Sequence, residues 1–256
     1  YIEQADRAQR QFNRSIQQGG KDAQQLVSSI RNVAAAYLSI QGARVAMEIS
    51  DEYMNTLARL DLMNDGLQTT AELQEKVFAA AERARGSYTD MAGVISRLGI
   101  LAGHAFGDND EIIAFAELMQ KAFRIGGASV IEQQSGMYQL TQALAAGRLQ
   151  GDEFRAIMEN APLLARAIAD VTGKSIGELK EMSAEGTITA DIIKAAMFRA
   201  ADEINEKFAS LPRTFGDYFT QIKNIALWEF GPVIERISEL LNTDAGERFT
   251  ATLAGG

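Results

Sequence analysis

The sequence predicts an all-α protein, and three observations lead to this prediction. Only three prolines occur in 256 residues, and aromatic residues make up 7%. Alanine, leucine, glutamate, glutamine and arginine are abundant, and these residues favour helix over strand. Apolar residues also recur at steps of three and four, as they do on one face of a helix. We therefore expect a multi-helix globular domain flanked by long amphipathic, coiled-coil-like helices.

The first long helix is expected from Asp22 to about Ile49. Its apolar residues follow alternating steps of four and three, at Leu26, Ile30, Val33, Tyr37 and Ile40. This spacing is the a/d seam of a helix that packs against a partner helix. We therefore expect the chain to self-associate as a homo-oligomer, a trimer or higher.

The segment from residue 53 to residue 63 fits two kinds of structure. Tyr53, Leu57, Leu60 and Met63 suit one face of a helix. Residues 56–62 instead alternate between polar and apolar, as a half-buried strand does. One short strand in this segment therefore stays open as an alternative to a helix.

Helix starts are well marked in the body of the chain. Capping boxes, in which a Ser or Thr hydroxyl and a Glu three residues later satisfy free backbone N–H groups, occur at Thr69, Ser129 and Ser175. Ser87 and Asp108 begin further helices, and Thr189 is expected to cap a helix that runs to about Phe208. Asn160 is expected to cap a helix whose first residue is Pro162. A final helix begins after Thr214 and carries an apolar pattern at Phe215, Phe219, Ile222 and Ala226.

We divide the chain into three parts. Residues 1–49 form an N-terminal long helical segment, residues 50–230 a helical domain, and residues 231–256 the start of a C-terminal helical extension. The chain opens on Tyr1 and closes on Gly255 and Gly256, so we expect an excerpt from a longer polypeptide. Its longest uncharged stretch has 12 residues, from Asn32 to Ala43, whereas a membrane span needs about 20. No membrane span is expected in this fragment.

Composition narrows the classes of function. A net charge of −9 is unfavourable for binding nucleic acid or an anionic membrane, since neutralising phosphate needs a basic surface. Residues 171–190 could form a helix-turn-helix, but the region from Arg148 to Arg199 has seven basic and eight acidic residues, where a DNA-reading helix should be basic. We therefore expect no sequence-specific binding of nucleic acid. Cysteine is absent, so disulfides and thiolate metal sites are excluded.

Two short motifs suggest chemistry but have structural explanations. His104 lies near Asp108 and Asp110, yet without a second histidine a zinc site is not expected. Gly151-Asp152-Glu153-Phe154 matches the end of a nucleotide-cyclase signature, whose acids would have to lie on a strand hairpin. Here the tetrapeptide lies between two helix patterns. We expect no catalytic residues, no metal and no cofactor.

The stretch from Gly147 to Pro162 is therefore interpreted as a connector between helices. Gly147 ends one helix, and Asp152 with Glu153 favours the positive N-terminus of the next. Phe154 supplies core. Arg148 has no assignment from helix patterns, and we expect it to pair with a carboxylate of the same stretch, such as Glu153.

These residues also carry a family resemblance. Residues 140–154, which end in Ala-Gly-Arg-Leu-Gln-Gly-Asp-Glu-Phe, together with Glu159-Asn160-Ala161-Pro162-Leu163, resemble the N-terminal domain of tail tape measure proteins of long-tailed phages and prophages. Two further blocks agree: residues 172–179 with 184–191, and Pro212 to Phe215 before Asn224. The likeness covers roughly residues 50–230. Its signature residues are Gly147, Arg148, Gly151, Glu153, Phe154, Asn160 and Pro162.

The resemblance implies a function. Tape measure proteins are long and mostly helical, lie in several copies along the lumen of the tail tube, and set its length. They guide polymerisation of the tube and leave with the DNA at infection, sometimes helping it cross the host envelope. The implied partners are tail tube and tail tip or baseplate proteins and tail assembly chaperones. The implied locations are the virion tail and, during assembly, the host cytoplasm. Family members are typically far longer than this sequence and often hold hydrophobic spans.

Two other functions remain as alternatives. The first is a tail-associated peptidoglycan hydrolase domain, with His104 or the paired acids Asp152 and Glu153 in its site. The second is a helical adaptor or toxin-like module of a mobile element.

Overall fold

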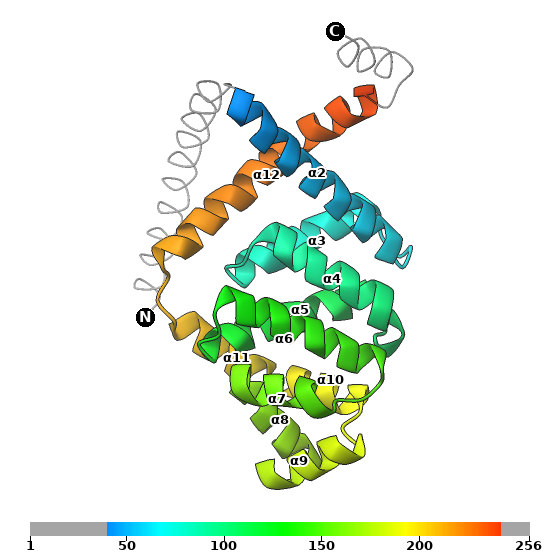
Figure 1. The fold of residues 1–256 in the computed structure, drawn as a ribbon, viewed down its shortest axis with the longest axis vertical. Coiled ribbons are helices and arrows are strands. Elements are labelled where there is room, and N and C mark those ends of the chain that lie inside the picture. Colours follow the sequence, from blue (N-terminus) through cyan, green and yellow to red (C-terminus); the bar gives the residue numbers. More distant parts are fainter. Residues whose placement is uncertain (1–39, 242–256) are drawn as a thin grey trace, which may run out of the picture. The chain divides into compact units, whose positions relative to one another are not determined.

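The computed structural model describes residues 40–241, with side chains described for residues 50–232, and all regular structure in this part is helical (Figure 1). The predicted all-α class is confirmed. The chain divides between Glu52 and Tyr53, and the unit that begins at Tyr53 is described by itself below. The elements are α2 (Ile40–Met63), α3 (Thr70–Arg83), α4 (Tyr88–Ala102), the 3₁₀ turn η1 (Gly103–Ala105), α5 (Asn109–Ile125), α6 (Val130–Ala145), α7 (Gly151–Asn160), α8 (Pro162–Thr172), α9 (Ile176–Glu185), α10 (Ala190–Arg199), α11 (Ala201–Ser210) and α12 (Phe215–Leu241).

Residues 53–63 are helical, so the alternative of a short strand is wrong. Tyr53, Thr56, Leu60 and Met63 are all buried, at steps of three, four and three. This is the spacing of one helix face, whereas a strand would bury every second residue. The polar–apolar alternation of residues 56–62 is therefore incidental, since Leu62 is 76% exposed.

The predicted helix starts are confirmed at the capping residues. Thr69, Ser129 and Ser175 each form a reciprocal capping box with the glutamate three residues on. Hydrogen bonds from the backbone and hydroxyl of Ser175 lower the pKa of Glu178 to about 2. Ser87, Asp108 and Thr189 cap α4, α5 and α10 through side-chain oxygens. The helix ends are therefore set by local sequence.

Three expected helix boundaries are wrong. The first helix does not end at about Ile49, because α2 runs without a break from Ile40 to Met63. The helix predicted from Thr189 to Phe208 is two helices, because α10 ends at Arg199 and α11 begins at Ala201. The break lets α10 pack against α8 while α11 packs against α5. Asn160 does not cap α8: it is the last residue of α7, and Ala161 holds the capping position without a side-chain hydrogen bond. Pro162 is the first residue of α8, as predicted.

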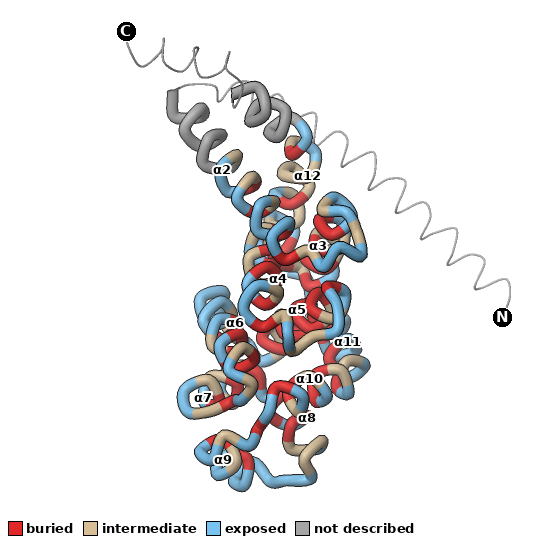
Figure 2. Tube along the Cα trace, turned by 90° about the vertical axis from the view of Figure 1, so that its right-hand side faces the viewer, coloured by how far each residue is buried: buried red, intermediate tan, exposed pale blue. Residues whose placement is uncertain are grey.

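The core of this unit is organised around α5. This helix contacts α3, α4, α6, α8, α10 and α11, and buried positions concentrate along it and on the helix faces that surround it (Figure 2). Phe115, Met119 and Phe123 on α5 are fully buried. The helices around α5 are thereby held in place, and their connections carry the features described next.

Candidate functional site

The first feature is the end of α6, where the backbone reverses in a Schellman motif. Gly147 has a φ of +74°, the left-handed conformation that glycine adopts without strain. The N–H of Gly147 donates to Leu144 O at 3.1 Å and the N–H of Arg148 donates to Ala143 O at 2.9 Å. These bonds satisfy the last carbonyls of α6 and direct the chain toward a second loop.

That second loop connects α9 to α10 and pairs with the first. The N–H of Leu149 donates to Ile188 O at 2.8 Å, and the N–H of Ala190 donates to Gly147 O at 3.0 Å. Arg148 and Thr189 thus form an isolated antiparallel bridge. Leu149 and Ile188 are both fully buried beneath it. We call residues 147–150 and 186–190 together the clasp.

The two halves of the clasp approach closely at Gly186. This residue ends α9 in the left-handed conformation, with a φ of +69°. A Cβ added to it would lie 2.5 Å from Gln150 Nε2 and 3.3 Å from Arg148 Cδ. Glycine is therefore required here by its backbone conformation and by the side chains that cover it.

Arg148 does not form the ion pair expected for it. Its side chain is exposed, and no ion pair joins it to Glu153 or to any other residue among those with described side chains. Arg155 instead lies 3.7 Å from Asp152 on the surface of α7. The reason is geometric, because Arg148 enters the bridge as part of an extended segment and its side chain runs along Gly186.

The rest of the stretch from Gly147 to Pro162, which we call the joint, positions α7 and α8. Asp152 and Glu153 lie in the first turn of α7, where they complement the helix dipole. Phe154 and Ile157 are buried. The turn between α7 and α8 packs on the end of α5, since a Cβ on Gly126 would lie 2.5 Å from the carbonyl oxygen of Asn160. The signature residues therefore line one continuous connection between α6 and α8.

The second feature is the attachment of α12, which is made largely by polar side chains. Thr214 and Asp217 cap the helix reciprocally: the N–H of Thr214 donates to Asp217 Oδ2 at 2.9 Å, and the N–H of Asp217 donates to Thr214 Oγ1 at 3.2 Å. Asp217 also accepts a hydrogen bond from Arg124 of α5 at 2.5 Å. Burial raises the pKa of Asp217, but Arg124 and Thr214 outweigh it and hold the pKa below its usual value.

Asn224, two turns further along α12, is buried and uses both ends of its amide. Its Nδ2 donates to Gly86 O and to Glu82 Oε1, both at 2.8 Å, and its Oδ1 accepts from the N–H of Tyr88 at 2.8 Å. Because these groups lie at the connection from α3 to α4, one asparagine ties α12 to two helices. Further on, Trp228 stacks on Phe78 of α3 with ring centroids 4.6 Å apart.

The loop before α12 is held by an arginine in an unusual conformation. Arg85 follows α3 with a φ of +54°, a backbone conformation that residues other than glycine rarely adopt. Its guanidinium donates to Leu211 O at 2.9 Å and lies 4.6 Å from the ring centroid of Phe208. The side-chain contacts offset the backbone strain and fix the end of α11 against α3.

The residues that carry the family resemblance therefore lie in two structural features. One is the joint with its clasp, and the other is the attachment of α12. A family model described as tape measure protein matches residues 44–228. The chain belongs to the tape measure protein family. No curated protein and no solved structure matches it. Tape measure proteins are structural proteins of the phage tail, associated with the tail tube, and the family is not one of enzymes.

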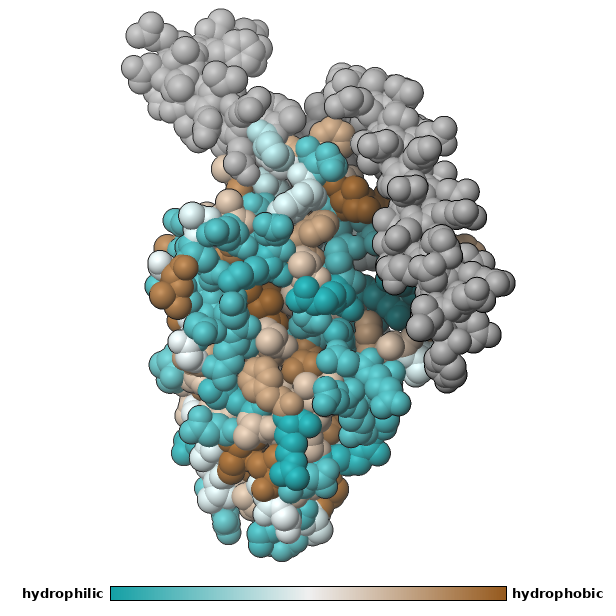
Figure 3. Space-filling model, turned by 180° about the vertical axis from the view of Figure 1, so that it is seen from behind, coloured by the Kyte–Doolittle hydropathy of each residue, from teal (hydrophilic) through white to brown (hydrophobic). Residues whose placement is uncertain are grey.

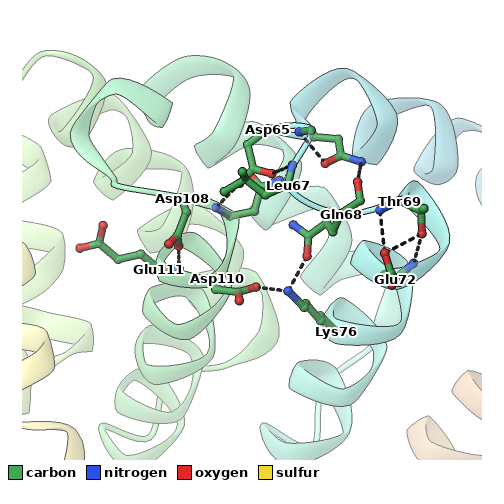
Figure 4. Close-up of polar contacts among 12 residues, drawn as sticks. Asp65, Leu67, Gln68, Thr69, Glu72, Lys76, Asp108, Asp110 and Glu111 are labelled. Carbon is green, nitrogen blue, oxygen red and sulfur yellow. Dashed lines mark hydrogen bonds and ion pairs between the residues drawn. The ribbon is translucent and has the colours of Figure 1, made fainter.

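The acidic groups near His104 have structural roles in this tape measure domain. Asp108 caps α5, and Asp110 pairs with Lys76 at 2.6 Å, while Lys76 also donates to Gln68 (Figure 4). Asp65 accepts from the N–H of Asn109 at 2.9 Å, which fastens the loop between α2 and α3 to the start of α5. His104 itself is exposed. Within the described part of the chain, no three His, Cys, Asp or Glu side chains are grouped so as to hold a metal ion.

The surface of the domain is mixed in character. Hydrophilic side chains cover much of the face seen in Figure 3, with apolar groups between them. Among residues 40–241, none of the helices combines the length and the apolar content that a bilayer crossing requires.

Sequence reasoning missed three parts of these features. It did not pair residues 147–150 with 186–190, although each loop contains a glycine that signals a reversal. It did not assign Asn224, and it did not identify Thr214-x-x-Asp217 as a capping pair, although that spacing was visible. The first two depend on contacts between distant segments and have no local signal.

Proposed function

We propose that this domain lies within the lumen of the tail tube, as part of a longer tape measure chain that sets tube length during assembly and takes part in genome delivery. The observation that carries the proposal is the family match over residues 44–228, which includes the three blocks described above. We propose that the domain lies in the tube lumen in the finished virion. During assembly it lies in the host cytoplasm.

The signature residues act in this proposal as a folding joint. Gly147 and Gly151 take left-handed backbone conformations, Phe154 is buried, and Pro162 starts α8. Glu153 and Asn160 lie at the start and end of α7, and Arg148 lies in the bridge of the clasp. We propose that together they fix the path from α6 to α8.

The proposed partners are the tail tube, the tail tip or baseplate, tail assembly chaperones and further copies of the chain. Self-association as a trimer or higher is assigned to the seam from Leu26 to Ile40, most of which lies outside the described residues. The division into an N-terminal segment (1–49), a tape measure domain (50–230) and the start of a C-terminal extension (231–256) is part of the same proposal.

A matched pair of variants in the parent phage tests the role in assembly. Leu149→Asp places a charge beneath the clasp, where Leu149 is fully buried, and Leu67→Asp places the same charge where the side chain is 79% exposed. Burying an unpaired carboxylate destabilises a fold strongly. We expect Leu149→Asp to abolish tails of normal length in electron micrographs and Leu67→Asp to leave them unchanged. Normal, infectious tails from Leu149→Asp phage would contradict the proposal.

Self-association is tested separately on the purified chain. We expect light scattering to give a trimer or higher species and Val33→Asp to shift it toward monomer, since a charge at the seam is disfavoured. A strict monomer at high concentration would count against this part of the proposal.

A further inference from the structure

The starting point is the backbone reversal at the end of α3. The N–H of Arg85 donates to Glu82 O at 3.1 Å and the N–H of Gly86 donates to Ala81 O at 2.9 Å, which is the bonding pattern of a Schellman motif. Arg85 holds the left-handed position of that motif, with a φ of +54°. Along the described backbone, Arg85 is the only residue other than glycine with a positive φ. The end of α3 is therefore strained.

The same motif ends three other helices, and each of them uses glycine. Gly127, Gly147 and Gly186 hold the left-handed position after α5, α6 and α9, with the same pair of backbone hydrogen bonds. Glycine adopts this conformation without steric cost, whereas a residue with a Cβ does not. An arginine at this position must therefore be held there by contacts that glycine would not make.

Two hydrogen bonds from outside α3 hold Arg85, and both lead toward α12. The guanidinium of Arg85 donates to Leu211 O, in the segment between α11 and α12, at 2.9 Å. The carbonyl oxygen of Arg85 accepts from Nη1 of Arg124 at 2.7 Å. Nη2 of the same Arg124 side chain donates to Asp217, in the first turn of α12, at 2.5 Å. The left-handed conformation of Arg85 is thus tied to the place where α12 begins.

Asn224 of α12 extends this arrangement along the connection from α3 to α4. Its Nδ2 donates to Gly86 O and its Oδ1 accepts from the N–H of Tyr88, both at 2.8 Å. If α12 moved away, these two hydrogen bonds and the ion pair between α12 and α5 would break. Buried backbone groups are costly without partners, and a strained residue persists only while its surroundings hold it. The docked position of α12 and the strained end of α3 therefore stabilise each other.

We propose that the end of α3 is a conformational switch that responds to the docking of α12. With α12 docked, Arg85 is held in the left-handed conformation and the Schellman motif is closed. When α12 undocks, Arg85 relaxes to a negative φ, the hydrogen bond from Gly86 to Ala81 breaks, and the connection to α4 loosens. Such coupling is reciprocal, so a contact that fixes the α3–α4 connection also favours docking of α12. The clasp shares none of these hydrogen bonds and does not respond.

Hydrogen exchange at single backbone amides, followed by NMR on the full-length chain, separates the two events. The N–H of Tyr88 donates to Asn224 of α12, so its exchange reports undocking. The N–H of Gly86 donates to Ala81 within α3, so undocking alone would leave this hydrogen bond intact. The Gly86 amide exchanges faster only when the reversal at Arg85 opens.

Asp217→Ala weakens the docking of α12 without changing the reversal itself. The variant removes the cap of α12 and the ion pair with α5. We expect the amides of Tyr88 and Gly86 to exchange at least ten times faster than in the wild type, and the amide of Leu149 in the clasp to keep its rate. Ser175→Ala, which removes the cap of α9, should leave Tyr88 and Gly86 unchanged. An unchanged Gly86 amide in Asp217→Ala would overturn the proposal. Equal acceleration at Leu149 would also overturn it, because the whole unit would then be opening.

A matched pair of variants at position 85 tests the part played by strain. Arg85→Ala keeps a Cβ in the left-handed conformation but removes the side-chain bond to Leu211 O. The Gly86 amide should then exchange at least ten times faster even with Asp217 intact. Arg85→Gly removes the same bond together with the strain, so the Gly86 amide should stay as slow as in the wild type. Adding Asp217→Ala to Arg85→Gly should still speed the Tyr88 amide but no longer the Gly86 amide. Equal exchange of Gly86 in the alanine and glycine variants would show that strain plays no part and would overturn the proposal.

Discussion

The clasp and the attachment of α12 both join segments that are distant in the chain, but they do so with different groups. In the clasp, backbone N–H and C=O groups pair over the buried side chains of Leu149 and Ile188. At α12, side chains of Arg124, Asp217 and Asn224 make most of the junction, with Trp228 against Phe78, while Phe215, Tyr218 and Phe219 stay exposed. The clasp is thus part of the hydrophobic core, whereas α12 is attached by polar side chains and can be destabilised separately.

The largest loss of stability is expected from truncating the side chain of Leu149 beneath the clasp. Leu149→Ala removes a fully buried side chain and should lower the free energy of unfolding by about 3 kcal/mol. Because the core is continuous, denaturation followed by circular dichroism and by Trp228 fluorescence should shift together. Leu67→Ala, at an exposed site, should change stability by less than about 0.5 kcal/mol. A shift seen only in fluorescence would show that the clasp is not part of the common core.

A smaller and more local effect is expected at Asn224. Asn224→Ala leaves the buried carbonyl of Gly86 without its donor, which should destabilise the α12 junction by about 2 kcal/mol. Trp228 is the single tryptophan of the chain and lies on α12, so its emission reports the junction directly. We expect the fluorescence transition to move to lower denaturant than the circular dichroism transition. Coincident transitions would mean that α12 and the body unfold as one unit.

The attachment of α12 should also depend on pH. The folded-state pKa of Asp217 lies below its ordinary value of 3.8 because Arg124 and Thr214 outweigh the effect of burial. Its stabilising contribution is therefore full above that ordinary value and is lost as the pH falls through the lowered pKa. Acid titration of Trp228 emission should show this loss in the wild type and not in Asp217→Asn. Identical titrations of the two proteins would exclude Asp217 as the group responsible.

Two glycines in the clasp allow a matched comparison. Gly147→Ala and Gly186→Ala both place a side chain in the left-handed conformation, which costs about 1–2 kcal/mol. Gly147 has open space around it, while a Cβ on Gly186 meets the amide of Gln150. Gly186→Ala should therefore be the more destabilising in thermal melts, and adding Gln150→Ala should remove the difference. Equal effects without that second change would indicate that Gln150 moves away freely.

The smallest effect is expected at Arg148. Its side chain forms no ion pair among residues 50–232, so Arg148→Ala should alter stability by less than about 0.5 kcal/mol, within the usual range for surface sites. Differential scanning calorimetry checks this directly. A loss larger than about 1 kcal/mol would mean that the packing of Arg148 against Gly186 contributes more than its exposure indicates.

Local chemistry explains which parts of the fold could be predicted from the sequence. The helix starts at Thr69, Ser129 and Ser175 follow from pairs of residues three positions apart. In the folded chain each pair forms the capping box that the sequence predicts. The break at Ala200 has no glycine or proline to mark it and results from packing against two different helices. Asn160 fitted a capping pattern, but α7 extends through it and leaves only Ala161 between the helices.

The candidate site was predictable in its location but not in its contacts. The pattern from Gly147 to Pro162 predicts a connector, in which Gly147 ends α6 in a left-handed conformation and Phe154 is buried. Its partner at residues 186–190 lies about 40 positions away, and no local pattern encodes that pairing. For α12, the pattern at Phe215 and Phe219 correctly marked a helix, but tertiary contacts of Asp217 and Asn224 decided which face turned inward.

In the proposed position along the tail tube, the clasp has a mechanical consequence. Its two hydrogen bonds join Gly147 to Ala190 and Leu149 to Ile188, so the helices α7, α8 and α9 form a loop whose two ends are held together. A pull on the flanking helices α6 and α10 would break these two hydrogen bonds one after the other and would separate α8 from α10. If α7, α8 and α9 also unfolded, this segment of about 40 residues could span at most roughly 140 Å. The clasp therefore limits how far this part of the chain can extend while its two hydrogen bonds are intact.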